Sequence, residues 1–130
     1  DALFALARNE DDDATLHALC RRLLPAGRVI VTLGAAGCFA SHPDHAPDQA
    51  DGGGPIAFQR LAAQVVAVRD PTGAGDAFCG ALAASLALDR RAPFGHHVRF
   101  ANRYAALSSE RPGAAAAMPK RGELAARFGD

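Results

Sequence analysis

The stretch Asp70-Pro-Thr-Gly-Ala-Gly-Asp76 joins a short β-branched run to an alanine-rich apolar stretch. The run before it, 64–68, holds three valines, which is typical of a buried strand. The stretch after it, 77–88, repeats large apolar residues at four-residue spacing, as an amphipathic helix does. The two glycines can adopt backbone angles closed to other residues and let a ligand approach the main chain. The sequence therefore predicts a strand, a glycine turn and a helix, in that order.

A turn that opens a helix can bind an anion through its own backbone. The first amides of a helix have no intrahelical partner, and the helix dipole places partial positive charge beside them. The carboxylate of Asp76 would stand next to a phosphate bound there and could accept the proton of a substrate hydroxyl. Aspartate is also a preferred capping residue, so the turn alone favours a purely structural interpretation of Asp76.

The string DPTGAGDAF, residues 70–78, resembles the C-terminal signature of the ribokinase-like, PfkB-type carbohydrate kinases in the order and spacing of six functional positions. This resemblance implies ATP-dependent phosphorylation of a sugar or nucleoside hydroxyl, with Mg²⁺ as a cofactor. It implies that Asp76 is the catalytic base. It also implies that the amides of Ala74, Gly75 and Asp76 form an anion hole, with Gly73 in the same catalytic turn.

Further positions match the family after the predicted helix. Asn102, in an alanine-rich segment expected to be helical over 94–107, corresponds to a position beside the nucleotide. In members activated by a monovalent cation such as K⁺, the ion is held by oxygens of the residues matching Asp70, Thr72, Ser108, Arg111 and Gly113. Several of these oxygens are backbone carbonyls, which tolerate a change of side chain. His96 and His97, near the start of the same segment, are expected to be surface or boundary residues.

Two segments of the N-terminal half complete the resemblance. The run Thr32-Leu33-Gly34-Ala35-Ala36-Gly37 follows a predicted strand and resembles a family segment that lies along the nucleotide, although two glycines between strands are also typical of a plain hairpin. Asn9 and Asp12 correspond to an Asn-x-x-Glu motif that helps to organise Mg²⁺ and phosphates, with aspartate in place of glutamate. The acidic run 10–13 is equally suited to the solvated first turn of a helix over 14–24.

Composition limits the partners and the location. The 130 residues include 14 basic and 14 acidic side chains, so no basic footprint indicates a nucleic-acid partner. No run reaches the roughly 18 apolar residues of a membrane span, and no signal-peptide pattern opens the chain. Cys20, Cys38 and Cys79 lack metal-ligand spacing, which suits free thiols in a reducing cytoplasm. We therefore expect a small-molecule substrate and a cytoplasmic location.

Alternation of β-branched runs with helical periodicity predicts an α/β fold, with a mostly parallel sheet flanked by helices. Short runs at 3–6, 28–33, 38–40 and 56–61 are further expected strands, and 123–128 is an expected weak helix. The resemblance covers nearly the whole chain but only the C-terminal half of a three-layer ribokinase-like domain, without its sugar-binding half and lid. We therefore expect a fragment of such a kinase that carries the ATP site and the catalytic base. A non-catalytic nucleotide-binding or interaction domain, and a truncated, inactive kinase whose exposed sheet forms a homo-oligomer, are the alternatives.

Overall fold

The computed structural model describes residues 12–43 and 57–129. The expected strand at 3–6 and the residue Asn9 lie outside this part of the chain. The chain divides into two compact units, residues 1–62 and 63–130, which are described one at a time.

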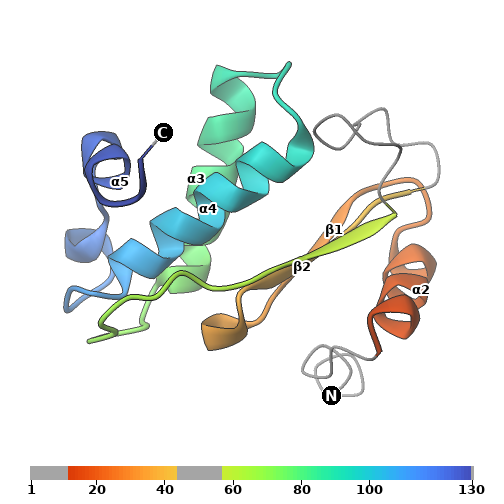
Figure 1. Cartoon of the computed structure of the whole chain (residues 1–130), viewed down its shortest axis with the longest axis horizontal. Helices are drawn as coiled ribbons and strands as arrows, with labels where there is room; N and C mark the ends of the chain where they lie inside the picture. Colours follow the sequence, from red (N-terminus) through yellow and green to blue (C-terminus); the bar gives the residue numbers. More distant parts are fainter. Residues whose placement is uncertain (1–11, 44–56, 130) are drawn as a thin grey trace. The chain divides into compact units, whose positions relative to one another are not determined.

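The first unit is a small antiparallel sheet with one helix packed on it (Figure 1). Helix α2 spans Asp13–Leu23. The strands are β1 (Val29–Thr32), β2 (Cys38–Ser41) and β3 (Phe58–Leu61), paired in the order β1-β2-β3. In the register, Val31 faces Phe39 and Phe39 faces Arg60. A 3-10 turn, η2 (Gly34–Ala36), connects β1 to β2.

The core of this unit lies between α2 and the sheet. Leu16, Cys20 and Phe39 are completely buried there. Leu16 and Cys20 lie four residues apart, on the same face of α2, as the apolar periodicity of the sequence predicts. Arg60 on β3 donates a hydrogen bond from Nε to the Asp13 carboxylate at 2.9 Å. One acid of the expected acidic helix start therefore holds the helix to the sheet.

The second unit is an α-helical hairpin with a short third helix beside it (Figure 1). Helix α3 spans Ala74–Leu88, α4 spans Phe94–Ser108 and α5 spans Arg121–Phe128, with a 3-10 turn, η3 (Ala115–Ala117), before α5. Helices α3 and α4 pack along each other, which their alanine-rich faces permit. All three helices were predicted, with ends that differ by a few residues.

Two expectations about strands are corrected. The run 64–68 forms no strand, and Val65 in it is 95% exposed. This segment is held instead by single hydrogen bonds such as that from the Ala67 amide to the Glu110 carboxylate, at 3.1 Å. The α/β class is confirmed, but the expected mostly parallel arrangement is not: the three described strands pair antiparallel, because the short η2 turn can join β1 to β2 only in that way.

Buried polar side chains in the hairpin were not expected. His97 is 1% exposed, and its Nδ1 lies 2.7 Å from Ser85 Oγ, so the two side chains form a hydrogen bond between α4 and α3. His97 is therefore part of the hairpin core, whereas His96 beside it is exposed.

Gly73 fixes the start of α3. It has φ of +78°, in the left-handed region, and a Cβ built on it would lie 3.0 Å from the Ala114 Cβ. We predict that Gly73→Ala lowers the free energy of unfolding by about 1–3 kcal/mol, because it adds left-handed strain and a close contact. Urea unfolding followed by circular dichroism measures the change.

Gly80 provides the matched control for this substitution. It lies inside α3, and a Cβ there would meet no described atom within 4 Å. Gly80→Ala should raise stability by about 0.5–1 kcal/mol through helix propensity. Equal effects of the two substitutions would contradict the role given to Gly73.

Candidate functional site

The candidate catalytic turn leads into α3 through residues 70–76. Thr72 donates its amide to Asp70 Oδ1 at 3.0 Å, and the Ala74 amide donates to the Pro71 carbonyl at 3.1 Å. The Ala77 amide makes the first bond of the helix, to the Gly73 carbonyl at 2.8 Å. The turn is thus closed by the Asp70 side chain and by its own backbone before the helix begins.

Two amides of the first helical turn are left over. Among the described residues, nothing accepts a hydrogen bond from the amides of Gly75 and Asp76. A Cβ on Gly75 would meet no described atom within 4 Å. The exposed amides lie at the positive end of a 15-residue helix, where an anion is stabilised. Of the three amides expected in the anion hole, these two are free to donate, and that of Ala74 is already bonded within the turn.

The Asp76 side chain is exposed in the first turn of α3 and makes no capping hydrogen bond. Gly73 is the residue that caps this helix, in the left-handed conformation. The purely structural interpretation of Asp76 as the helix cap is therefore wrong. Its carboxylate belongs to the same first helical turn as the two free amides.

The loop that follows α4 lies against this turn. Asp70 Oδ2 accepts a hydrogen bond from the Gly113 amide at 2.9 Å, and the Asp70 amide donates to the Ser109 carbonyl at 3.0 Å. Hydrogen bonds from Thr72 and Gly113 lower the pKa of the Asp70 carboxyl, since they stabilise its charged form. Residues expected to hold a monovalent cation are brought together here from two segments about forty positions apart, as shown by the Asp70–Gly113 hydrogen bond.

The oxygens available in this loop pair fit a hard cation. Asp70 supplies a carboxylate, each oxygen of which accepts one amide and keeps further lone pairs. The Ser108 carbonyl accepts only a long bond from the Arg111 amide, at 3.4 Å. The Arg111 guanidinium pairs with Glu123, which raises the pKa of Arg111 and lowers that of Glu123. Because Arg111 pairs with Glu123, its positive charge is balanced there and not at the Asp70 carboxylate.

The residues expected to contact the nucleotide or the Mg²⁺ surroundings differ in how exposed they are. Thr32 ends β1 and is exposed, Leu33 donates its amide to the Gly37 carbonyl at 2.8 Å, and the turn from Gly34 to Ala36 is exposed. Both the nucleotide-contact and the hairpin interpretations fit this exposed turn. Asn102 is 8% exposed within the second unit. Asp12 precedes α2 and makes no capping hydrogen bond.

Within residues 12–43 and 57–129, no three His, Cys, Asp or Glu side chains form a metal-binding group. No helix in the same part of the chain is both long and apolar enough to span a membrane. The three cysteines are free, with Cys20 and Cys38 buried and Cys79 exposed. Burial raises the pKa of the Cys38 thiol to about 11.

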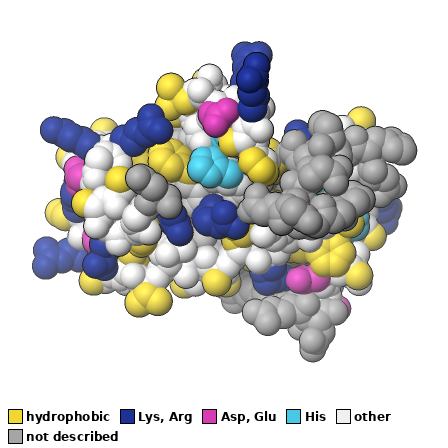
Figure 2. All heavy atoms as spheres, turned by 45° about the horizontal axis from the view of Figure 1, so that its top comes forward, with side chains coloured by type: hydrophobic (Ala, Val, Ile, Leu, Met, Phe, Trp, Pro, Cys, Tyr) yellow, Lys and Arg dark blue, Asp and Glu magenta, His cyan; other side chains and the backbone are white. Residues whose placement is uncertain are grey.

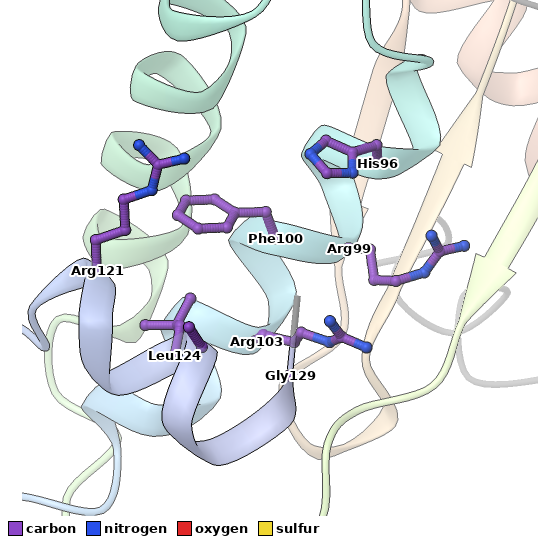
Figure 3. A pocket seen from close by; sticks show the side chains of 8 residues that line it. His96, Arg99, Phe100, Arg103, Arg121, Leu124 and Gly129 are labelled. Carbon is purple, nitrogen blue, oxygen red and sulfur yellow. The ribbon is translucent and has the colours of Figure 1, made fainter.

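A basic face of α4 was not predicted from the sequence. His96, Arg99, Phe100 and Arg103 recur at three- and four-residue spacing on α4 and line a cavity of about 380 Å³ with residues of α5 (Figure 3). Their helical spacing was a signal for a shared basic face. It was overlooked because the expected function needed no residue of this face.

Solved structures of similar proteins are sugar kinases. A ribokinase from Thermotoga maritima is 26% identical, with a TM-score of 0.70 over 88% of this chain and 35% of its own. A fructokinase from Vibrio cholerae O395, bound to fructose, ADP and calcium, is 32% identical, with a TM-score of 0.62 over 76% of this chain and 30% of its own. A ribokinase from Cryptococcus neoformans with ADP shares the fold, with 23% identity and a TM-score of 0.72 over 92% of this chain and 36% of its own.

These comparisons confirm the ribokinase-like fold. The chain spans about a third of the length of the solved relatives it matches. The model of the pfkB family of carbohydrate kinases matches residues 1–121. The chain therefore belongs to the pfkB family of carbohydrate kinases.

Proposed function

We propose that this chain carries the nucleotide-binding and base-bearing part of an ATP-dependent kinase that phosphorylates a hydroxyl of a sugar or nucleoside. The observation that supports it most is the start of α3: two unbonded amides, an uncrowded glycine and an exposed carboxylate lie in one helical turn. The fructokinase similar to this chain was solved with fructose and ADP, the two kinds of ligand that such a reaction needs.

The proposed reaction uses the amides of Gly75 and Asp76 and the carboxylate of Asp76, together with ATP and Mg²⁺. ATP with Mg²⁺ would supply the phosphoryl group and neutralise its developing charge. The amides of Gly75 and Asp76 donate to the oxygens of the transferred group, in the direction favoured by the helix dipole. The Asp76 carboxylate accepts the proton of the acceptor hydroxyl, whose oxygen forms the new bond to phosphorus while the bond to ADP breaks.

Other parts of the site are proposed with it. The exposed turn Gly34–Ala36 and Asn102 contact the nucleotide, and Asp12 with Asn9 contributes to the Mg²⁺ surroundings. Asp70 and the carbonyl oxygens of Thr72, Ser108, Arg111 and Gly113 hold a monovalent cation beside the anion hole. We further propose a cytoplasmic location, since the three free thiols suit a reducing compartment.

A specific observation favours one alternative. The chain covers only about a third of the length of its solved relatives, so it could bind nucleotide without a complete acceptor site. Nucleotide binding without transfer to any sugar or nucleoside would support this truncated or non-catalytic form. Light scattering on the same sample then separates a monomer from a homo-oligomer.

The base is tested by Asp76→Asn. We predict that this change lowers the rate of phosphoryl transfer by about 10²–10⁴-fold, because it removes the proton acceptor and leaves the turn intact. Affinity for ATP with Mg²⁺ should stay within about threefold, because a single charge interaction at an exposed position contributes little to binding. Calorimetry measures the binding, and ADP release over a panel of sugars measures the transfer. A variant that keeps the full transfer rate would exclude Asp76 as the base.

The anion hole is tested by Gly75→Ala. A methyl group there meets no described atom but occupies the space in front of the amides, so stability should rise by about 0.5–1 kcal/mol while ATP affinity falls. Gly80→Ala is the control, because it makes the same change in the same helix away from the turn. Calorimetric titration with ATP and thermal unfolding report the two effects. Equal ATP affinity in both variants would place the phosphates elsewhere.

The lowered pKa of Asp70 predicts that the stability of the chain depends on pH. Its pKa is lowered in the folded chain, so the stability it contributes is complete above its unfolded pKa, about 4, and is lost as the pH falls through the lower folded value. We expect the difference in unfolding free energy between the wild type and Asp70→Asn to shrink as the pH falls below about 4. Urea titrations over a pH series measure it. A difference that is constant with pH would rule out the charged hydrogen bonds as its cause.

A further inference from the structure

A second candidate site lies between α4 and α5, on residues that the proposed kinase site does not use. Its cavity of about 380 Å³ is lined from α4 by His96, Arg99, Phe100 and Arg103, and from the α5 region by Arg121, Leu124, Ala125 and Gly129. Figure 3 shows the side chains of Arg99 and Arg103 directed to the same side of α4, with Arg121 contributed by α5. No carboxylate lines this cavity among the described residues.

The positive charge of the cavity is not neutralised by the parts of the chain that the structure describes. The ion pairs recorded there join Arg60 to Asp13, Arg111 to Glu123 and Arg127 to Glu110. None involves Arg99, Arg103 or Arg121, so three guanidinium groups share one cavity without an acid. Figure 2 shows basic side chains spread over the face it draws, with a few acidic ones among them. The chain as a whole has no net charge, so this is a local concentration of positive charge.

Arg103 gives the second observation. Its guanidinium lies over the Phe128 ring, with Cζ 5.7 Å from the centroid, which is a cation–π contact. Its Nε atom is buried, yet it has no hydrogen-bond acceptor among residues 12–43 and 57–129. A buried N–H without an acceptor is costly. Arg103 therefore lines the cavity without an acceptor of its own in the described chain.

We propose that this cavity binds a small phosphate monoester. Arg99 and Arg103 hold the phosphate, because two guanidinium groups offer the fork of donors that matches its oxygens. Phe100 and Leu124 give the cavity apolar surface for the organic part of the ligand. Arg121, exposed at the start of α5, raises the local positive potential.

The ligand's size follows from the volume. A cavity of about 380 Å³ is near the lower end of the range for small-molecule pockets, so it suits a compact ester and not a polymer. A polyanion such as nucleic acid would need a longer basic surface, which the neutral chain does not favour.

Phenyl phosphate is the probe that tests this site, since it combines a phosphate with an apolar ring. We predict that its titration into the ¹⁵N-labelled chain shifts the Nε–Hε signal of Arg103, and that calorimetry gives tighter binding than for inorganic phosphate. Arg103→Gln and Arg99→Gln should each weaken the affinity about tenfold or more, the usual loss for a hydrogen bond to a charged group. Arg103→Lys should also weaken it, because lysine keeps the charge but lacks the fork.

Arg90→Gln is the matched control, because it removes the same charge from an exposed residue outside the cavity. It should change the affinity by less than about twofold. Thermal unfolding of each variant checks the fold, and Arg99→Gln decides the test if Arg103→Gln unfolds. Sodium chloride at equal ionic strength should not reproduce the signal shifts.

Three results would overturn the proposal: unchanged affinity in both glutamine variants, equal losses in Arg90→Gln, or benzoate binding as tightly as phenyl phosphate. Failure of the proposed kinase site would be seen separately. Gly75→Ala should leave phenyl phosphate binding at this cavity unchanged, since Gly75 is not among its lining residues. Binding lost in Gly75→Ala but kept in Arg103→Gln would place the phosphate at the start of α3 and exclude this cavity.

Discussion

The Asp70 carboxylate is the constraint on which the second unit depends. With one oxygen it accepts the Thr72 amide, which closes the turn before α3, and with the other it accepts the Gly113 amide, in the loop after α4. A single side chain thus fixes both ends of the helical hairpin at one place. Because the Arg69 and Asp70 amides also donate to the Ser109 carbonyl, side chain and backbone impose the same arrangement. This arrangement positions the first turn of α3 before any ligand is present.

The start of α3 separates the tasks of holding the helix and meeting a ligand. Gly73 caps the helix by its conformation, without a side-chain oxygen, so the neighbouring carboxylate of Asp76 is not required for capping. An aspartate at the N-cap position accepts hydrogen bonds from the first amides, whereas Asp76 is the third residue of the helix. Here the left-handed glycine leaves two amides and one carboxylate unused. These unused groups are the ones that the proposed phosphoryl transfer needs.

Sequence reasoning succeeded where a local pattern determines the structure. The apolar spacing of Leu16 and Cys20 and the alanine-rich segments predicted the helices, and the glycine turn after β1 predicted the strand pairing that follows it. It failed where the structure of a segment depends on a contact with residues far away in the sequence. Val65 has high strand propensity but no neighbouring strand among the described residues, and it is exposed. His97 lies in the hairpin core because Ser85, twelve positions away, supplies its hydrogen bond, which no local pattern reveals.

The two proposed anion sites offer a phosphate different kinds of donor. At the start of α3 the donors are backbone amides, which among substitutions only proline removes and whose direction the helix fixes. Between α4 and α5 the donors are guanidinium groups on flexible stems, and that of Arg103 contacts the Phe128 ring. A rigid donor pair suits a group that must be held in one orientation while bonds change. A cavity of charged, adjustable side chains suits equilibrium binding of an intact ester. The proposed transfer therefore fits the rigid amides of α3, and the proposed ester binding fits the arginines of α4.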